Sequence, residues 1–436
     1  MKARVYLLGL AVLCSACAAP SLRYKTEVNR LIPQGDFQTA AAKVEAKRPK
    51  MYARKDRALA YLDHAALLHD AGQTEKSDDL FAHAQDRMEE LYTRSATRTA
   101  GQFLINDLTL PYSVADYERA LTYFYRAMNF LDQNKLEDAT VEVRRAVQFL
   151  DNLRGSKKKG YNDDPFVQYF ASLIFESAGQ LSDARICRTN ALNAYKNLGG
   201  VLEVSAPEFS VPPDYDKYGE VILFHYNGLL PLKKSATVQF AWDRIYGILS
   251  SARETQNGLS PEVENALVSG FMGHAVTLAY PVLEPQHYAI TSSFAQVNGQ
   301  QYRLQKMADF SAAAKQDLED RLPGIWFRAA ARAVAKQVAA EQARQAARKA
   351  GKDDTVGDLA GLFMNVLGSA TEKADTRQWF TLPAQIYMAR LFLPPGTQNI
   401  RLLFRDGYGN IVGEHVFENV QIVRGQRIFL HYRTAK

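Results

Sequence analysis

The histidines are the first residues to consider for chemistry, because imidazole binds metal ions and moves protons near neutral pH. No two of them have the HExxH or His-x3-His spacing that places two ligands on one helix face. His64 and His69 are five positions apart, which points their side chains to different faces of a helix. We therefore expect no metal centre and no cofactor. The eight histidines are His64, His69, His83, His225, His274, His287, His415 and His431.

Motifs for nucleophilic, redox and phosphate chemistry are also missing. The one CxxC pair, Cys14 and Cys17, is at the end of an N-terminal apolar leader, and the chain has no GxSxG and no GxxxxGK[ST] sequence. The acidic pairs 89–90 and 353–354 fit solvated surface better than a general acid and base. The sequence therefore predicts that the protein is not an enzyme. The alternative of another class is an envelope hydrolase whose site is assembled from distant residues of the C-terminal half.

The N-terminal residues have the layout of a secretory leader. Lys2 and Arg4 precede the apolar run 5–13, and a basic start before such a run is typical of signal peptides. The run cannot span a bilayer core, because a spanning helix needs about 20 residues. The small residues Ser15 and Ala16 then stand before a cysteine.

This ending resembles the lipobox of bacterial lipoproteins, with Cys14 where that family usually has leucine. The resemblance implies that residues 1–16 are removed as a signal peptide and that Cys17 carries a diacylglyceryl thioether and an acylated amino group. Each buried methylene contributes about 0.8 kcal/mol to anchoring, so several acyl chains hold the protein almost permanently. Ala18 and Ala19 follow in place of a retaining Asp, which implies an outer-membrane protein that faces the periplasm.

Charge and cysteine content exclude two other kinds of protein. The chain has 53 basic and 47 acidic residues, a net charge of +6, which is too weak to indicate nucleic-acid binding. Cys187 is the only cysteine left once the leader is removed and Cys17 is modified. We therefore expect no internal disulfide, although the compartment would allow one.

An internal repeat organises the first half of the chain. Apolar residues recur every three or four positions up to about residue 199, which predicts successive helices. A small residue stands five positions after each of four turn residues. Another small residue stands twelve positions after each of the last three turn residues. Two antiparallel helices approach closely where side chains are small, so we expect these residues in the seams of helical hairpins. The turn residues are Gly35, Gly72, Asn134 and Gly179, and the small residues are Ala40, Ser77, Ala84, Ala139, Ala146, Ala184 and Ala191.

In this register, residues 71–84 and 178–191 resemble tetratricopeptide repeats. The turn residues are 37, 62 and 45 positions apart, whereas that family repeats at about 34, and insertions near 97–111 and 155–164 account for the excess. The resemblance implies a solenoid with a concave face that grips a segment of another protein. The alternative is a spacer or a dimer surface.

Glycines and prolines accumulate after residue 199 and end the helical pattern. We expect a helical domain at 17–199, a linker at 200–218 and a mixed β-rich domain at 219–436. Asn298-Gly299 and residues 407–410 predict turns within the last domain. Its predicted strands are 220–226, 275–282, 289–297, 302–305, 385–393, 399–404, 412–423 and 427–432.

A helical insertion at about 309–370 interrupts these strands. Helical spacing from Leu318 to Val338 predicts a long helix over about 309–350, kinked at Pro323. The apolar run 356–370 is too short to span a membrane and predicts a buried or interface helix. The predicted fold class is α+β: an N-terminal all-α tetratricopeptide-like helical-hairpin solenoid, then a C-terminal β-rich α+β domain with a long inserted helix.

The stretch 374–379, followed by Leu382-Pro383 and 394–396, resembles a motif in uncharacterised proteobacterial lipoproteins. Those proteins join tetratricopeptide-like helices to a C-terminal β domain, and the order of elements in this chain is similar. We interpret the motif as structural first, with Trp379 and Pro383 capping a strand, and Arg377 pairing with Asp375 or stacking on an aromatic ring. A functional surface is the alternative. The motif residues are Asp375, Arg377, Trp379, Leu382 and Pro383.

These features predict a lipid-anchored periplasmic scaffold or adaptor. We expect its helical repeats to bind an envelope protein, whose identity the sequence does not give, in the assembly or regulation of a cell-envelope machine. Two narrower versions stay open, an activator of peptidoglycan synthases and an assembly factor for a secretion or surface structure. Contact with the membrane is expected through the lipid anchor, and the oligomeric state is not predicted.

Overall fold

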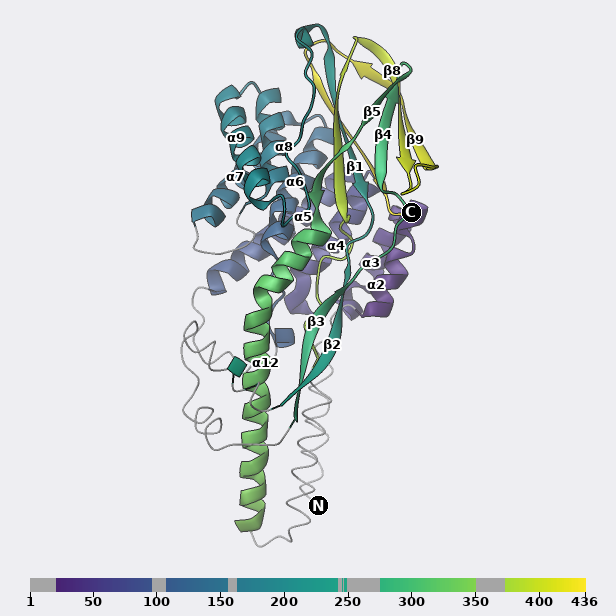
Figure 1. The fold of residues 1–436 in the computed structure, drawn as a ribbon. Coiled ribbons are helices and arrows are strands. Elements are labelled where there is room, and N and C mark those ends of the chain that lie inside the picture. The colour runs from purple at the N-terminus through teal and green to yellow at the C-terminus, as the bar shows by residue number, and fades with distance from the viewer. Residues whose placement is uncertain are drawn as a thin grey trace.

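Helices precede strands in this α+β protein, and a long helix separates two groups of strands (Figure 1). The computed structural model describes residues 21–95, 107–155, 163–241, 245, 247–248, 275–349 and 373–436. The leader, Cys17 and the apolar run 356–370 lie outside the described residues. Among the described residues, no helix is long and apolar enough to cross a bilayer.

Four antiparallel helical hairpins build the first half. They pair α2 (Leu22–Asn29) with α3 (Phe37–Met51), α4 (Arg57–Asp70) with α5 (Thr74–Ser95), α6 (Asp116–Asp132) with α7 (Leu136–Gly155), and α8 (Pro165–Ser177) with α9 (Leu181–Leu198). Short 3-10 turns complete this half and the linker: η2 (Ile32–Gln34), η3 (Arg54–Asp56), η5 (Asp107–Thr109) and η6 (Tyr215–Lys217).

All four hairpins turn in the same way. Gly35, Gly72, Asn134 and Gly179 each have a φ between 59° and 74°, the left-handed conformation that ends many helices. In each case the amide of the next residue donates to the carbonyl four positions before the turn residue, for example Gln73 to Leu68 at 2.8 Å. This bond satisfies a carbonyl that the helix end leaves open.

Three sheets follow. The central sheet has the order β10 (Arg427–Thr434), β1 (Gly219–Asn227), β7 (Gln385–Leu393), β6 (Gln305–Asp309), and the outer sheet has the order β5 (Gln300–Arg303), β4 (Ser292–Val297), β8 (Gly396–Arg405), β9 (Ile411–Ile422). A two-stranded hairpin of β2 (Leu232–Ala241) and β3 (Ala275–Glu284) lies beside α12 (Phe310–Lys349). β1 pairs parallel with β10 and antiparallel with β7.

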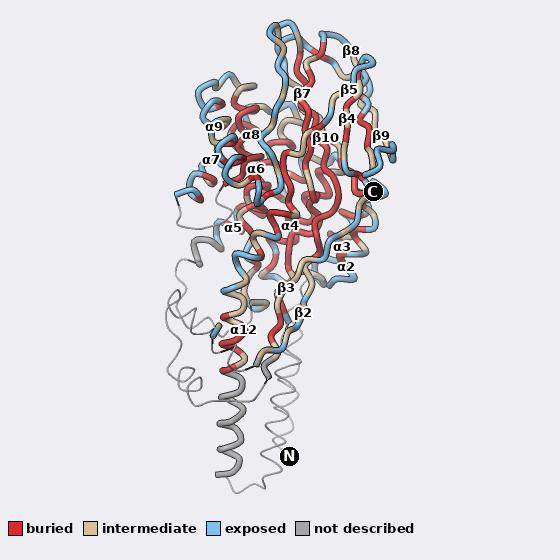
Figure 2. The backbone as a smooth tube through the Cα atoms, viewed as in Figure 1, coloured by how far each residue is buried: buried red, intermediate tan, exposed pale blue. Residues whose placement is uncertain are grey.

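The helices, the central sheet and the outer sheet form three layers. Side chains alternate across β1: Phe224 and Tyr226 join the core shared with the helices, whereas Val221 and Leu223 join the core shared with the outer sheet. Every residue of β1 is therefore buried. Figure 2 shows buried backbone running from α4 through the central strands, so the two predicted domains share one core.

The structure differs from the sequence-based expectations in two places. β2 was not expected, because Lys233, Lys234 and Ser235 hide its alternation. The predicted strand 302–305 divides between β5 and β6. The predicted long helix is present as α12, which continues through Pro323 and changes direction in the part nearest the sheets, as Figure 1 shows. The other predicted strands each overlap an observed one.

Candidate functional site

The small residues of the predicted repeat register lie inside the helical layer, and its turn residues are exposed at the hairpin ends. The small residues at both repeat positions are at most 4% exposed, and the turn residues stand between the paired helices. Helix pairs come close at these seams, so this set packs the hairpins and presents no binding surface. The buried members are Ala40, Ser77, Ala84, Ala139, Ala146, Ala184 and Ala191.

The side of α4, α6 and α8 that contacts the central sheet, here called the inner face, is the candidate site. The expectation from the sequence was a face open to another protein. Instead, residues 375–382 of the same chain lie against it, just before β7. We call these residues the internal segment. It carries most of the C-terminal motif, and Pro383 follows it in a buried position.

Asp63 of α4 binds the backbone of this segment. Its Oδ1 accepts from the amides of Phe380 at 3.1 Å and Thr381 at 3.4 Å, and its Oδ2 accepts from the Tyr52 hydroxyl at 2.8 Å. Asp63 is 0% exposed. Burial raises its pKa to about 8, because the charged form loses its hydration there. Asp63 therefore holds a proton to a much higher pH than a solvated aspartate does.

Glu118 of α6 makes the equivalent contact one residue earlier. Its Oε1 accepts from the Trp379 amide at 3.1 Å, and its Oε2 accepts from the Ala115 amide at 3.0 Å and the Tyr112 hydroxyl at 2.6 Å. The same carboxylate thus caps the first turn of α6 and holds the segment. Hydrogen bonds to backbone amides recognise an extended chain without reading its side chains.

Arg377 anchors the start of the segment. Its Nη2 donates to Asp375 Oδ2 at 2.6 Å, and its Nη1 donates to Asp56 Oδ1 at 2.6 Å and to the Leu110 carbonyl at 2.8 Å. Its guanidinium also lies 5.9 Å from the centre of the Tyr112 ring. Both expected contacts of Arg377, with Asp375 and with an aromatic ring, are therefore present, and Asp56 adds a third from the helices.

The two carboxylate partners of Arg377 have pKa values shifted in opposite directions. Burial opposes ionisation of Asp375, but the hydrogen bond and the charge of Arg377 outweigh burial and lower the pKa of that carboxyl. For Asp56, burial dominates and raises the pKa. Lys25 of α2 donates to the Thr376 carbonyl at 2.6 Å, and burial lowers its pKa to about 8.

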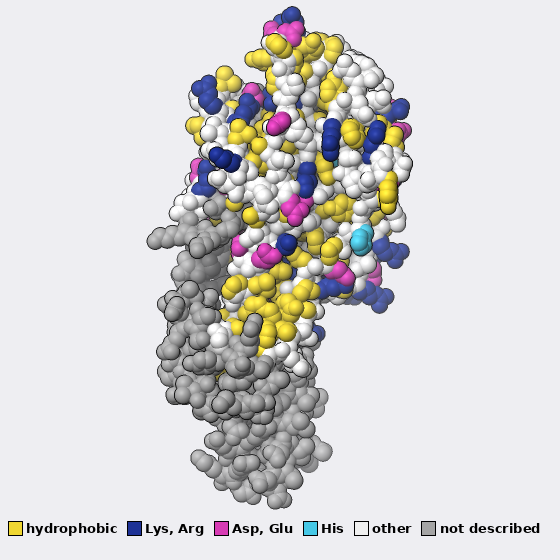
Figure 3. Space-filling view, viewed as in Figure 1, with side chains coloured by type: hydrophobic (Ala, Val, Ile, Leu, Met, Phe, Trp, Pro, Cys, Tyr) yellow, Lys and Arg dark blue, Asp and Glu magenta, His cyan; other side chains and the backbone are white. Residues whose placement is uncertain are grey.

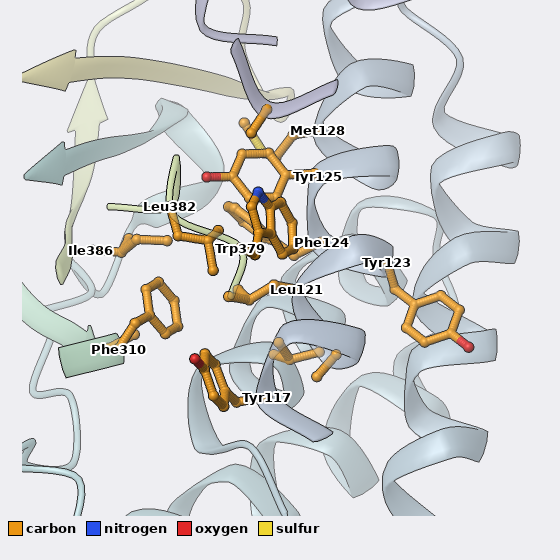
Figure 4. Packing of buried hydrophobic residues seen from close by; sticks show 14 of the residues in the cluster. Tyr117, Leu121, Tyr123, Phe124, Tyr125, Met128, Phe310, Trp379, Leu382 and Ile386 are labelled. Carbon is orange, nitrogen blue, oxygen red and sulfur yellow. The ribbon is translucent and has the colours of Figure 1, made fainter. Parts of the chain in front are cut away.

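Trp379 is the apolar centre of the segment. It is 0% exposed, and its ring centroid lies 5.7 Å from that of Phe81 and 5.8 Å from that of Tyr125. Figure 4 shows Trp379 and Leu382 directed at Leu121 and Tyr125. Burial of such a ring contributes several kcal/mol to stability, so the inner face is a permanent packing surface.

Sequence reasoning found the segment but missed the helical groups that hold it. Asp56, Asp63 and Glu118 are isolated acids in helical sequence, where a solvated position is the usual interpretation. A possible signal was that Asp63 lies between the apolar residues Leu62 and Ala65 on a helix with few other charges. The distance in sequence to residue 377 gave no indication of a pair.

A second cluster joins His69, Asp132 and His431, whose possible ligand atoms lie within 4.8 Å of one another. Its members come from α4, α6 and β10. Spacing searches along the sequence could not find it, because no two members are near each other in the chain. It is the one group of this kind among the described residues.

The outer surface offers further features. On the face drawn in Figure 3, charged side chains are scattered. Apolar side chains gather over the part of the molecule that holds α12, β2 and β3. A pocket of about 410 Å³ between α3 and α4 is lined by Arg48, Arg54 and Arg57 together with Tyr52 and Tyr61. Exposed apolar residues also stand on α9: Leu181, Ile186 and Leu192 are 63%, 57% and 43% exposed.

Comparison with models of known protein families finds none that matches this chain. Comparison with curated protein sequences also finds no match.

Proposed function

We propose that this protein is a lipid-anchored periplasmic adaptor of the outer membrane that holds a protein of the cell envelope and performs no catalysis of its own. The helical hairpins, which are similar to tetratricopeptide repeats, provide the scaffold. Narrower roles within this proposal are activation of a peptidoglycan synthase and assembly of a secretion or surface structure.

The observation that carries the proposal is Cys17 directly after Ser15-Ala16 at the end of the apolar run 5–13. Thioether acylation needs a cysteine at the new N-terminus, and a plain secretory leader has no need of one. An acylated protein is confined to the membrane surface, so its partner belongs to the same compartment.

The partner surface follows from what the fold leaves open. The inner face already holds the internal segment through Asp63, Glu118 and Arg377, so an incoming peptide would have to displace Trp379 from a closed core. The outer side of α9 instead presents Leu181, Ile186 and Leu192 to solvent. Three large apolar side chains on the exposed half of one helix are the feature that we take to mark a protein contact. We therefore propose α9 as the contact surface.

Photo-crosslinking in the living cell tests this proposal. A photoreactive amino acid at Ile186, followed by solubilisation and purification, is expected to capture one envelope protein in good yield. The matched control carries it at Tyr408, which is 94% exposed on the β8–β9 turn, and is expected to capture none. A purified protein that cleaves wall fragments, with no crosslinked partner at Ile186, would establish an enzyme in place of an adaptor.

A further inference from the structure

The His69, Asp132 and His431 cluster lies where the helical layer meets the central sheet. His69 stands in the last turn of α4, Asp132 ends α6, and His431 is in β10. The three possible ligand atoms, two imidazole nitrogens and a carboxylate oxygen, lie within 4.8 Å of one another. Two imidazoles and a carboxylate are a ligand set of zinc sites and of non-haem iron sites.

A chain of hydrogen bonds fixes the tautomer of His69. The Ser77 hydroxyl donates to the Ala65 carbonyl at 2.8 Å, so its oxygen is free to accept from Asn129 Nδ2 at 3.0 Å. The other amide atom of Asn129, its Oδ1, then faces His69 Nδ1 at 2.7 Å. An amide oxygen only accepts, so Nδ1 carries the proton and the lone pair of His69 is on Nε2.

That lone pair has no partner among the described residues. His69 is 0% exposed, and its Nε2 is a buried atom without a hydrogen bond. Because Nδ1 donates to Asn129, Nε2 is the ring nitrogen that offers a lone pair to a ligand. A metal-bound histidine has this arrangement, with one nitrogen on the metal and the other donating to an oriented oxygen.

Asp132 and His431 are the other two members of the cluster, and both are partly exposed to solvent. Asp132 Oδ2 lies 3.1 Å from His431 Nε2, and their side chains are 22% and 18% exposed. Burial opposes ionisation of Asp132, but its hydrogen bond to His431 outweighs burial and lowers the pKa of the carboxyl. The cluster thus joins a buried neutral imidazole to a charged carboxylate and an imidazole at the rim.

We infer that these three residues form a binding site for a divalent transition-metal ion of the zinc type. The ion would take the lone pair of His69 Nε2, an oxygen of Asp132 and His431 Nε2, and water from the open side would supply a fourth ligand, as in zinc sites with three protein ligands. The proton on His431 Nε2 moves to Nδ1, or to water when the ring is charged. Bound there, the ion ties two helices to the C-terminal strand.

Binding requires one local movement. The rings of His69 and His431 now stack, with centroids 4.4 Å apart and planes 17° from parallel. The lone pair of an imidazole lies in the plane of its ring, so two stacked rings do not direct both nitrogens at one ion. On a tetrahedral zinc ion two such nitrogens lie about 3.3 Å apart. His69 is held by Asn129, so His431 at the rim must turn. The neighbouring cation Arg433 lies 3.9 Å from the carboxylate of Asp70, which offsets part of its charge.

Metal titration of the full-length protein, purified in detergent without a histidine tag, tests the site. Co²⁺ is the spectroscopic probe, and Zn²⁺ is the competitor. We expect one equivalent of Co²⁺ to produce a visible absorption band that Zn²⁺ abolishes. His431→Ala and Asp132→Asn each remove a ligand, so each is expected to weaken binding by more than the roughly 10- to 100-fold that loss of an outer-shell partner causes.

Two further variants separate a built site from a chance pair at the surface. Ser77→Ala touches no ligand but breaks the chain that fixes the tautomer of His69, so it is expected to weaken binding by about 10- to 100-fold. His415→Ala removes another half-buried imidazole that stacks on an aromatic ring, Tyr432 at 3.8 Å, and should bind as the wild type does. No saturable Co²⁺ binding by the folded wild type, or equal affinity in the wild type, His431→Ala and Asp132→Asn, would overturn the inference.

Discussion

The carboxylate of Glu118 accepts a hydrogen bond from the amide of Trp379 at 3.1 Å, although 261 positions separate the two residues. The same carboxylate caps α6 through Ala115. One buried acid therefore fixes both the start of a helix and the path of the internal segment. The helical layer binds residues 375–382 of its own chain, and the two halves of the chain depend on each other for their core.

Trp379→Ala is expected to destabilise the whole described fold. The ring fills the space between Phe81 and Tyr125, and loss of a fully buried Trp costs about 3–5 kcal/mol. Urea unfolding followed by helical circular dichroism measures the change. Helices and sheet should still unfold in one transition because they share the core. Tyr408→Ala, at a position 94% exposed, is the control and should change nothing. Separate transitions for helix and sheet would contradict a shared core.

Asp63→Asn should remove a pH dependence. The pKa of Asp63 rises from 3.8 to about 8 on folding, so between these values the folded chain keeps a proton that the unfolded chain has released. The free energy of unfolding therefore falls as pH rises through this window. The slope for one such proton is on the order of 1 kcal/mol per pH unit. Asn keeps the Oδ1 acceptor for Phe380 and Thr381 and has no proton to lose.

The measurement compares the two proteins by urea unfolding at pH 5 and pH 7, below the value of about 8 to which the pKa of Lys25 is lowered. From pH 5 to pH 7 the free energy of unfolding of the wild type should fall relative to that of Asp63→Asn. Parallel changes in both proteins would mean that Asp63 is already ionised in the folded chain.

Ala139→Leu is expected to overpack the seam between α6 and α7. Ala139 is 0% exposed, and extra methylenes in a packed core cost about 1–3 kcal/mol. Val141→Leu on the same helix adds a methylene at a position that is 50% exposed, and its melting temperature should not move. Equal melting of both variants would show that the small residue is not needed for the approach of the helices.

Gly179→Ala tests the left-handed turn of the last hairpin. A Cβ there would meet nothing within 4 Å, and φ is +73°, so any loss comes from the backbone conformation and should be about 1–2 kcal/mol. Gly200→Ala is the matched control, with equally open space and no such φ. Thermal melting is expected to separate the two variants, and identical melting would leave the turn without a glycine requirement.

Local rules predicted the parts of this fold that local physics decides. The left-handed turns at Gly35, Gly72 and Gly179 follow from a residue type that accepts positive φ, and most strands follow from alternation and turn residues. The same rules missed β2, because the residues Lys233 and Lys234 have a low strand propensity. Pairing with β3 holds this segment as a strand in spite of that propensity.

The candidate sites were beyond such rules. Asp63 and Glu118 become important only because the chain returns to them more than 200 positions later, and a single sequence contains no record of that return. The same holds for His69, Asp132 and His431, whose common position is fixed by the packing of β10 on α4 and α6. Arg377 was the exception, since its partner Asp375 is two residues away.

Mass spectrometry of the N-terminal peptide from the membrane fraction tests the central claim most directly. The proposal predicts a mature chain that begins at Cys17 and carries a diacylglyceryl thioether and an amide-linked acyl chain, and a Cys17→Ala variant that is not processed in this way. A mature chain that begins elsewhere, or one with an unmodified Cys17 in the soluble fraction, would contradict it.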